Sequence, residues 1–190
     1  PFTLQAGTVT GTGSLTLNGA FTLSGGTLSG TGALVTSGTT AVNNGTAILD
    51  RRAWNNFGAM GINGRLNLDN GATFVNHVGG TIDISAGNTN IRPLLWDGTG
   101  TLPAFSNLGT LTKNSLVDIQ LNVAVNNAGT INVGTGQVEL TRGGTHSGAF
   151  GLASGTTLRF TGGTNALAAG TTVTGTGRVV MGGGATLIVD

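Results

Sequence analysis

The sequence predicts an all-β protein whose chain winds as a parallel β-helix, a three-sided β-solenoid. Three observations support this prediction. Residues 2–20 and 21–40 align without a gap, short apolar runs alternate with polar residues, and glycine, asparagine or aspartate separates the runs. Strands this short cannot each pair within one unit. We therefore expect each strand to pair with its equivalent in the next unit, about 4.8 Å along the axis.

A glycine followed by a small and then an apolar residue marks each repeat unit. Such anchors occur at Gly7, Gly26, Gly58, Gly80, Gly109, Gly129, Gly148 and Gly170. Most of them are evenly spaced, but the intervals from Gly26 to Gly58 and from Gly80 to Gly109 are clearly longer. The sequence therefore predicts one β-solenoid domain over residues 1–190, with roughly eight coils of about 19–22 residues, two of them longer.

Three strand-like runs follow each other within a unit. The first runs are led by Val9, Leu28, Met60, Ile82, Leu111, Ile131, Phe150 and Val173. The second runs are 14–17, 33–36, 65–69, 137–140, 157–160 and 178–181, and the third are 20–23, 72–75, 122–125 and 185–189. Gly-Thr-Gly triplets at 11–13, 30–32, 134–136 and 175–177 are interpreted as corners between the first and second sides, because glycine supplies the backbone freedom that tight turns need.

A polar residue stands two positions before several anchors. Asn56, Asn107 and Asn127 occupy this position, with His146 before Gly148, and counting from Gly79 adds His77. Amides stacked down one corner can bond coil to coil, so we predict a structural ladder here. The repeat phase separates the two histidines by several coils, and no metal site is expected.

The composition restricts the classes of function. Charged residues make up 8% of the chain and the net charge is +1, which gives no long-range attraction for nucleic acid or anionic lipid. No apolar run approaches the roughly 18 residues of a membrane span. The chain has no cysteine, hence no disulfide or thiolate metal site. Standard catalytic and nucleotide-binding motifs are missing, so we predict neither catalysis nor a cofactor.

A set of charged residues at equivalent positions of successive units, here called a column, is compatible with an enzyme as an alternative. The repeat phase brings Asp118, Glu139 and Arg159 to equivalent outward positions, preceded by Asn67. Two carboxylates about 5 Å apart are used by retaining glycosidases. A β-helix places any two neighbours of one column at that distance. The other interpretation is therefore a row of stacked charged side chains on the surface with no catalytic role. A polysaccharide lyase or hydrolase is therefore the third hypothesis for function.

The chain resembles a group of bacterial surface proteins over nearly its whole length. The segments "TVTGTGSLTL", "WNNFG", "LDNGATFVNHVGGTIDI", "NLGTLT" and "VNNAGTINV" are similar to the right-handed β-helical passenger and stalk regions of filamentous haemagglutinin-like adhesins, autotransporters and giant repeat adhesins. The resemblance implies a right-handed coil and an extracellular, structural or adhesive role at a bacterial surface. It implies no catalytic residues. We expect a segment of a longer repeat protein, with neighbouring coils or end-to-end copies as partners, and surface glycans or proteins as further ones.

The two longer units contain both tryptophans and supply the candidate contact residues. These are Asp50, Arg51, Arg52 and Trp54 in the first unit, and Arg92, Trp96 and Asp97 in the second. If both insertions leave on one face, they would lie about 10 Å apart, because one coil separates them. Exposed aromatic rings beside arginine and aspartate suit a carbohydrate-binding module, the second hypothesis. Alternatively, the tryptophans are buried and widen or cover the core.

Overall fold

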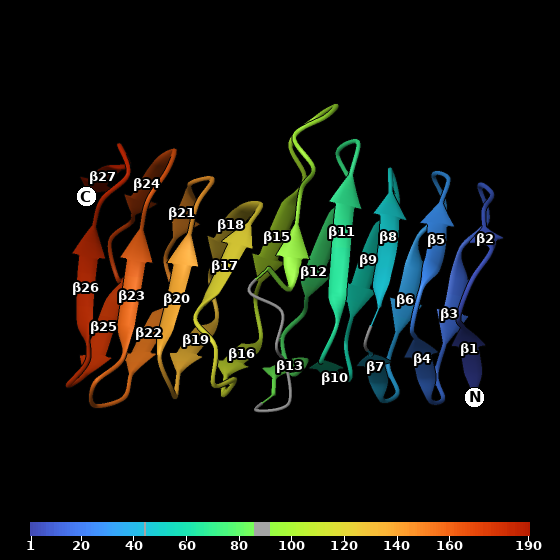
Figure 1. Ribbon diagram of the computed structural model, residues 1–190, viewed down its shortest axis with the longest axis horizontal. Coiled ribbons are helices and arrows are strands. Elements are labelled where there is room, and N and C mark those ends of the chain that lie inside the picture. The colour runs from blue at the N-terminus through green and yellow to red at the C-terminus, as the bar shows by residue number, and fades with distance from the viewer. Residues whose placement is uncertain (44, 86–91) are drawn as a thin grey trace.

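The chain folds as a β-solenoid of nine turns. The computed structural model describes residues 1–43, 45–85 and 92–190, and its strands form three parallel sheets of nine (Figure 1). Each strand pairs with the third strand after it, so that every turn contributes one strand to each sheet. The described ranges contain no helix, and hence no helix that is long and apolar enough to span a membrane. The predicted all-β, three-sided parallel solenoid is confirmed.

The three sheets have the following strands. Sheet A contains β1 (Phe2–Leu4), β4 (Phe21–Leu23), β7 (Thr40–Val42), β10 (Ala59–Ile62), β13 (Thr81–Ile84), β16 (Thr110–Lys113), β19 (Thr130–Val133), β22 (Ala149–Leu152) and β25 (Thr172–Gly175). Sheet B contains β2 (Thr8–Val9), β5 (Gly26–Ser29), β8 (Thr46–Asp50), β11 (Arg65–Asp69), β14 (Leu94–Leu95), β17 (Ile119–Asn122), β20 (Gln137–Leu140), β23 (Thr157–Phe160) and β26 (Arg178–Met181). Sheet C contains β3 (Leu15–Leu17), β6 (Leu34–Thr36), β9 (Ala53–Asn56), β12 (Thr73–Asn76), β15 (Ala104–Asn107), β18 (Ala124–Asn127), β21 (Gly144–His146), β24 (Thr164–Leu167) and β27 (Thr186–Val189). Turn 1 is β1–β3, turn 2 is β4–β6, and so on to turn 9.

The structure corrects the phase predicted for the first two units. The runs led by Val9 and Leu28 belong to sheet B, whereas those led by Met60 and the later residues belong to sheet A. The long interval that begins at Gly26 therefore contains five regular strands, β5 to β9, and no insertion. Along sheet A the paired positions recur at nearly even intervals, except for the wider step from Ile82 to Leu111. Only turn 5 is long.

The same correction applies to the Gly-Thr-Gly corners. The triplets at 11–13 and 30–32 join sheet B to sheet C, whereas those at 134–136 and 175–177 join sheet A to sheet B. At Gly30 the backbone has a positive φ of 90°, and a Cβ there would overlap the carbonyl of Gly11 in the turn below. Glycine is needed at this corner because successive corners stack backbone on backbone.

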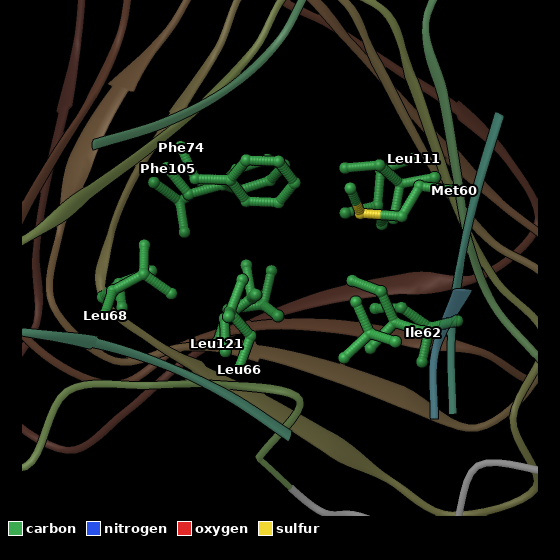
Figure 2. Close-up of a cluster of buried hydrophobic side chains, with 14 of the residues drawn as sticks. Met60, Ile62, Leu66, Leu68, Phe74, Phe105, Leu111 and Leu121 are labelled. Carbon is green, nitrogen blue, oxygen red and sulfur yellow. The ribbon is translucent and has the colours of Figure 1, made fainter. Parts of the chain in front are cut away.

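The core runs along the axis as columns of identical or similar apolar side chains. Strands such as β11 and β20 alternate half-buried and buried residues, which leaves one face in the interior. Figure 2 shows Phe74 against Phe105 from the adjacent turn. Met60 and Leu111, and likewise Leu66 and Leu121, lie in line two turns apart, and Ile82 and Leu94 are the residues between them. Because parallel strands place equivalent residues about 4.8 Å apart, each column packs at van der Waals distance without a special motif.

An aromatic column continues through the N-terminal half of the core. Ring centroids are 5.7 Å apart for Phe2 and Phe21, 5.8 Å for Phe21 and Trp54, 5.4 Å for Trp54 and Phe74, and 5.2 Å for Phe74 and Phe105. These tilted contacts are within the range in which aromatic pairs attract beyond simple burial. Trp54 is therefore a core residue of turn 3.

The predicted amide ladder is present at the corner between sheets C and A, with one substitution. Nδ2 of Asn56 donates to Oδ1 of Asn76, Asn76 donates to Asn107, and Asn107 donates to Asn127, each at 2.9 Å. Each of the first three amides also donates to a backbone carbonyl. His146 pairs with Asn127 in the strand register and continues the column. Asn76, and not the predicted His77, is the ladder residue of turn 4.

Lys113 occupies a core position at which the neighbouring strands place Ile84 and Val133. Its Nζ donates to the carbonyls of Ser115 and Thr135, at 2.7 and 2.6 Å. Burial lowers the pKa of Lys113, while the nearby Asp118 carboxylate acts in the opposite direction. The lysine thus links the segment before β17 to the corner between β19 and β20, one turn further along the solenoid.

We expect His146 to make stability depend on pH. The imidazole is fully buried beside Phe150 and Phe160, and its Nδ1 has no hydrogen-bond partner among the described residues. Burial lowers its pKa below the ordinary value of 6.5, although the Asn165 side chain opposes this. The unfolded chain therefore binds the proton more readily, and stability is full above about pH 6.5 and falls as the pH drops toward the folded-state pKa.

Urea unfolding at pH 7.5 and pH 5.5 measures this dependence. His146→Gln should flatten the difference between the two pH values, because no group then titrates at this position. His77→Gln is the control: its imidazole lies outside the core, stacked on Phe57. An unchanged pH dependence in His146→Gln would contradict the assignment.

Candidate functional site

The charged side chains, although scattered in sequence, lie mostly on one side of the solenoid. Twelve of the fifteen are in strands of sheet B or in the adjoining corners. They are Asp50, Arg51, Arg52, Arg65, Asp69, Arg92, Asp97, Asp118, Glu139, Arg142, Arg159 and Arg178. The outward faces of sheets A and C carry mainly hydroxyl, amide and small side chains. Among the described strands of these two sheets Asp83 of β13 is the charged exception, and Val35, Val75 and Ile188 of sheet C are larger apolar ones. A polar ligand that needs charged side chains would therefore bind on sheet B or at its corners.

Except for Arg92, the predicted contact residues lie at or near the corner between sheets B and C. Asp50 ends β8 in turn 3, and Trp96 and Asp97 follow β14 in turn 5, with β11 between these two strands in the sheet. Arg92 lies two residues before β14. The segment after β14, yellow-green in Figure 1, projects beyond the corners of the neighbouring turns. Apart from Arg92, the two groups thus lie at the same corner, with one turn between them.

Two of the candidate residues are buried. Trp54 is 0% exposed and Arg52 is 2% exposed. Arg52 donates from Nε to the carbonyl of Ser29 at 2.9 Å and from Nη2 to that of Gly11 at 3.3 Å, so it fastens three stacked corners. Burial lowers the pKa of Arg52. The insertion predicted for the first longer unit is wrong, because β8 and β9 are regular strands of the stack. The side chains of Arg52 and Trp54 cannot reach a ligand on the surface.

Carboxylates gather at the same corner. Asp50 lies beside Asp69 in the strand register, forms an ion pair with Arg51 at 3.3 Å, and accepts a hydrogen bond from Asn70 at 2.6 Å. Burial raises the pKa of Asp69, and the charges of Asp97 and Asp50 raise it further. No group of three or more potential metal ligands occurs among the described residues.

Asp69 and Asn70 were missed as candidate residues. A signal was present in the sequence, because "LDRRA" at 49–53 and "LDNGA" at 68–72 are similar segments one repeat apart. Aligning them puts Asp50 over Asp69, which is the register observed between β8 and β11. The shifted phase of the first units hid this alignment.

Trp96 is half-buried, and both its ring and its N–H are already in use. The indole Nε1 donates to the carbonyl of Thr99 at 2.7 Å, and the guanidinium carbon of Arg142 lies 5.1 Å from the ring centroid. Arg142 also donates from Nε to Oδ1 of Asn122 at 3.1 Å. Asp97 accepts from the backbone and hydroxyl of Thr99, which lowers the pKa of its carboxyl. A cation–π contact of this kind fixes the arginine over the ring.

The predicted column of Asp118, Glu139 and Arg159 with Asn67 is only partly correct. Glu139 does lie opposite Arg159, but its neighbour on the other side is Gln120. Asp118 precedes β17 and is outside the column, and Asn67 aligns through Leu95 with Asn122. The long turn shifted the residue count for Asn67. Asp118 is out of register for a different reason, because Gln120, two residues later, is the residue paired with Glu139. The carboxylate pair that suggested a polysaccharide-active enzyme is not formed in this column.

No protein-family model, curated protein or solved structure matches the chain. The fold and the geometry of its surface are therefore the basis for any functional inference.

Proposed function

We propose that this chain is a structural or adhesive rod segment of a bacterial cell-surface or secreted protein. The observation that supports this most directly is the unbroken stack: three sheets, each of nine parallel strands, surround one continuous core. Such a stack resists bending because every turn is hydrogen-bonded to its neighbours on three sides. An extracellular location agrees with a chain rich in uncharged hydroxyl and amide groups.

The partners we propose for the rod are further coils of the same kind. Side chains that continue the core columns are exposed in turn 9, among them Val173, Val179 and Val189. Another parallel coil stacked there would cover them and pair with the free edges of β25, β26 and β27.

Antibodies raised against this chain test the location and role. They should label intact, unpermeabilised cells of the bacterium that encodes it, and deletion of the segment should reduce attachment of those cells to surfaces. Labelling that requires permeabilised cells would reject the proposal.

A carbohydrate-binding module is the second candidate function. It is supported by Trp96, Asp97 and Arg142, which form a half-exposed aromatic and charged group on a projecting segment. Indole, guanidinium and carboxylate groups are common in sites that hold sugars.

A glycan array probed with the wild-type chain and with Trp96→Ala tests this second candidate. We expect bound glycans to be lost in Trp96→Ala, because both the ring and the support of Arg142 disappear. Phe57→Ala is the matched control, since Phe57 is an aromatic residue, 47% exposed, at a different corner, between sheets C and A. If both variants bind like the wild type, Trp96 is not a glycan contact.

A further inference from the structure

We propose that Arg92 and Arg142 form a site for the carboxylate groups of an acidic glycan, with Gln120 and Asn122 as positioning residues. This inference rests on the second candidate function and specifies its ligand. Neither Arg142 nor the two amide residues stood out in the sequence. Strand pairing brings together residues from three consecutive turns, with Arg92 before β14, the amides in β17 and Arg142 just after β20.

Strand β17 holds the two amides on its outer face. Ile119 and Leu121 are buried, and Gln120 and Asn122 alternate with them on the half-buried side. Residues two apart in a strand are roughly 7 Å apart. Gln120 and Asn122 can therefore each orient one guanidinium without crowding the other.

Each arginine is bound in the same way. Arg92 donates from Nε to Oε1 of Gln120 at 2.9 Å, and Arg142 donates from Nε to Oδ1 of Asn122 at 3.1 Å. Both arginines are exposed, and their Nη atoms make no hydrogen bond or ion pair within residues 1–43, 45–85 and 92–190. The free ends are planar forks of N–H donors, the geometry that binds a carboxylate with two parallel hydrogen bonds.

The Trp96 contact favours an anionic ligand over a neutral one. Because Arg142 lies 5.1 Å from the ring centroid, that face of the indole supports the guanidinium and is not open for stacking on a sugar. The ring and Asn122 hold Arg142 from two directions, which reduces the entropy lost when a ligand binds.

One carboxylate is already connected to this group. Gln120 donates from Nε2 to Oε2 of Glu139 at 3.0 Å, and Glu139 lies opposite Arg159 in the strand register. The glutamate therefore holds the amide with its oxygen toward Arg92, while Arg159 offsets the negative charge. The two guanidinium groups are thus held at separate positions on a chain of net charge +1, with the Asp97 carboxylate next to Trp96, an arrangement suited to spaced carboxylates and not to a dense polyanion.

Binding of an oligogalacturonate to this chain, compared with binding of the same oligomer fully methyl-esterified, tests the proposal. Esterification removes the charge and keeps the sugar backbone, so we expect binding of the acid form only. Arg92→Gln and Arg142→Gln should each weaken it by roughly tenfold or more, the loss expected for a charge-assisted hydrogen bond. Arg178→Gln, an exposed arginine of β26, is the control and should change affinity less than twofold.

Gln120→Leu and Asn122→Leu separate positioning from charge. Both leave the net charge unchanged and should still weaken binding of the acid form, with unfolding midpoints near that of the wild type. A loss in Arg178→Gln equal to that in Arg142→Gln, or equal competition by single-stranded DNA, would show diffuse charge attraction and overturn the proposal. Equal binding of the ester would overturn it while leaving the glycan-binding candidate intact. Failure to bind any glycan would reject both.

Discussion

Trp54→Ala is expected to lower the free energy of unfolding by about 3–5 kcal/mol, the usual cost of removing a large aromatic side chain from a core. The ring is fully buried, and its centroid lies 5.8 Å from that of Phe21 and 5.4 Å from that of Phe74. Its Nε1 also donates to the hydroxyl of Thr36 at 3.0 Å. Alanine would leave a cavity in turn 3 that the rigid backbone stack cannot collapse to fill. Urea unfolding followed by circular dichroism measures the loss.

Two further variants make the result specific. Trp54→Phe keeps most of the aromatic packing and loses the hydrogen bond, so it should cost about 1–2 kcal/mol. Trp96→Ala removes a half-buried indole and should cost less than Trp54→Ala. A Trp54→Ala variant as stable as the wild type would mean that the ring is not part of the core.

Asn107→Ala is expected to lower the free energy of unfolding by about 2–4 kcal/mol, because it interrupts the amide ladder in the middle. The substitution removes the acceptor of Asn76 and the donor to Asn127, both at 2.9 Å. It also removes the donor to the carbonyl of Thr130. All three amides are buried, so water cannot readily replace the lost partners. Denaturant unfolding provides the measurement.

Asn132→Ala is the matched control for the ladder. Asn132 lies in β19 of turn 7, whereas Asn107 is in turn 5, and its side chain is on the half-buried outer face. The same chemical change there should cost less than about 0.5 kcal/mol. Equal losses in the two variants would show that the ladder adds nothing beyond the general effect of removing an asparagine.

Much of the fold could be predicted from local pattern. Alternation in "RLNLD" and "QVEL" indicates strands with one buried face, and β11 and β20 coincide with these segments. The position of asparagine before the anchor glycines predicts the ladder, and three of its four asparagines were named. These features depend on neighbours within a few residues, which the sequence displays directly.

The site could be predicted only in part, because its geometry depends on register. Trp96, Asp97 and Arg92 were named, but their contacts Arg142, Asn122 and Gln120 come from other turns. The long turn shifts the residue count between β11 and β17, and that shift decides which side chains are neighbours. The spacing of the anchor glycines makes β8 and β9 resemble an insertion, so it predicts Trp54 and Arg52 at the site, whereas the structure buries both in the regular stack.

The hexapeptide Thr-Val-Thr-Gly-Thr-Gly shows where local information ends. It occurs at 8–13 and at 172–177, and in both places a short strand leads into a glycine corner. The sequence alone determined that much. The first copy lies in sheet B and turns into sheet C, whereas the second lies in sheet A and turns into sheet B. Three similar sides accept the same hexapeptide, so only pairing with the adjacent turns, through backbone hydrogen bonds and buried columns, decides which side each copy forms.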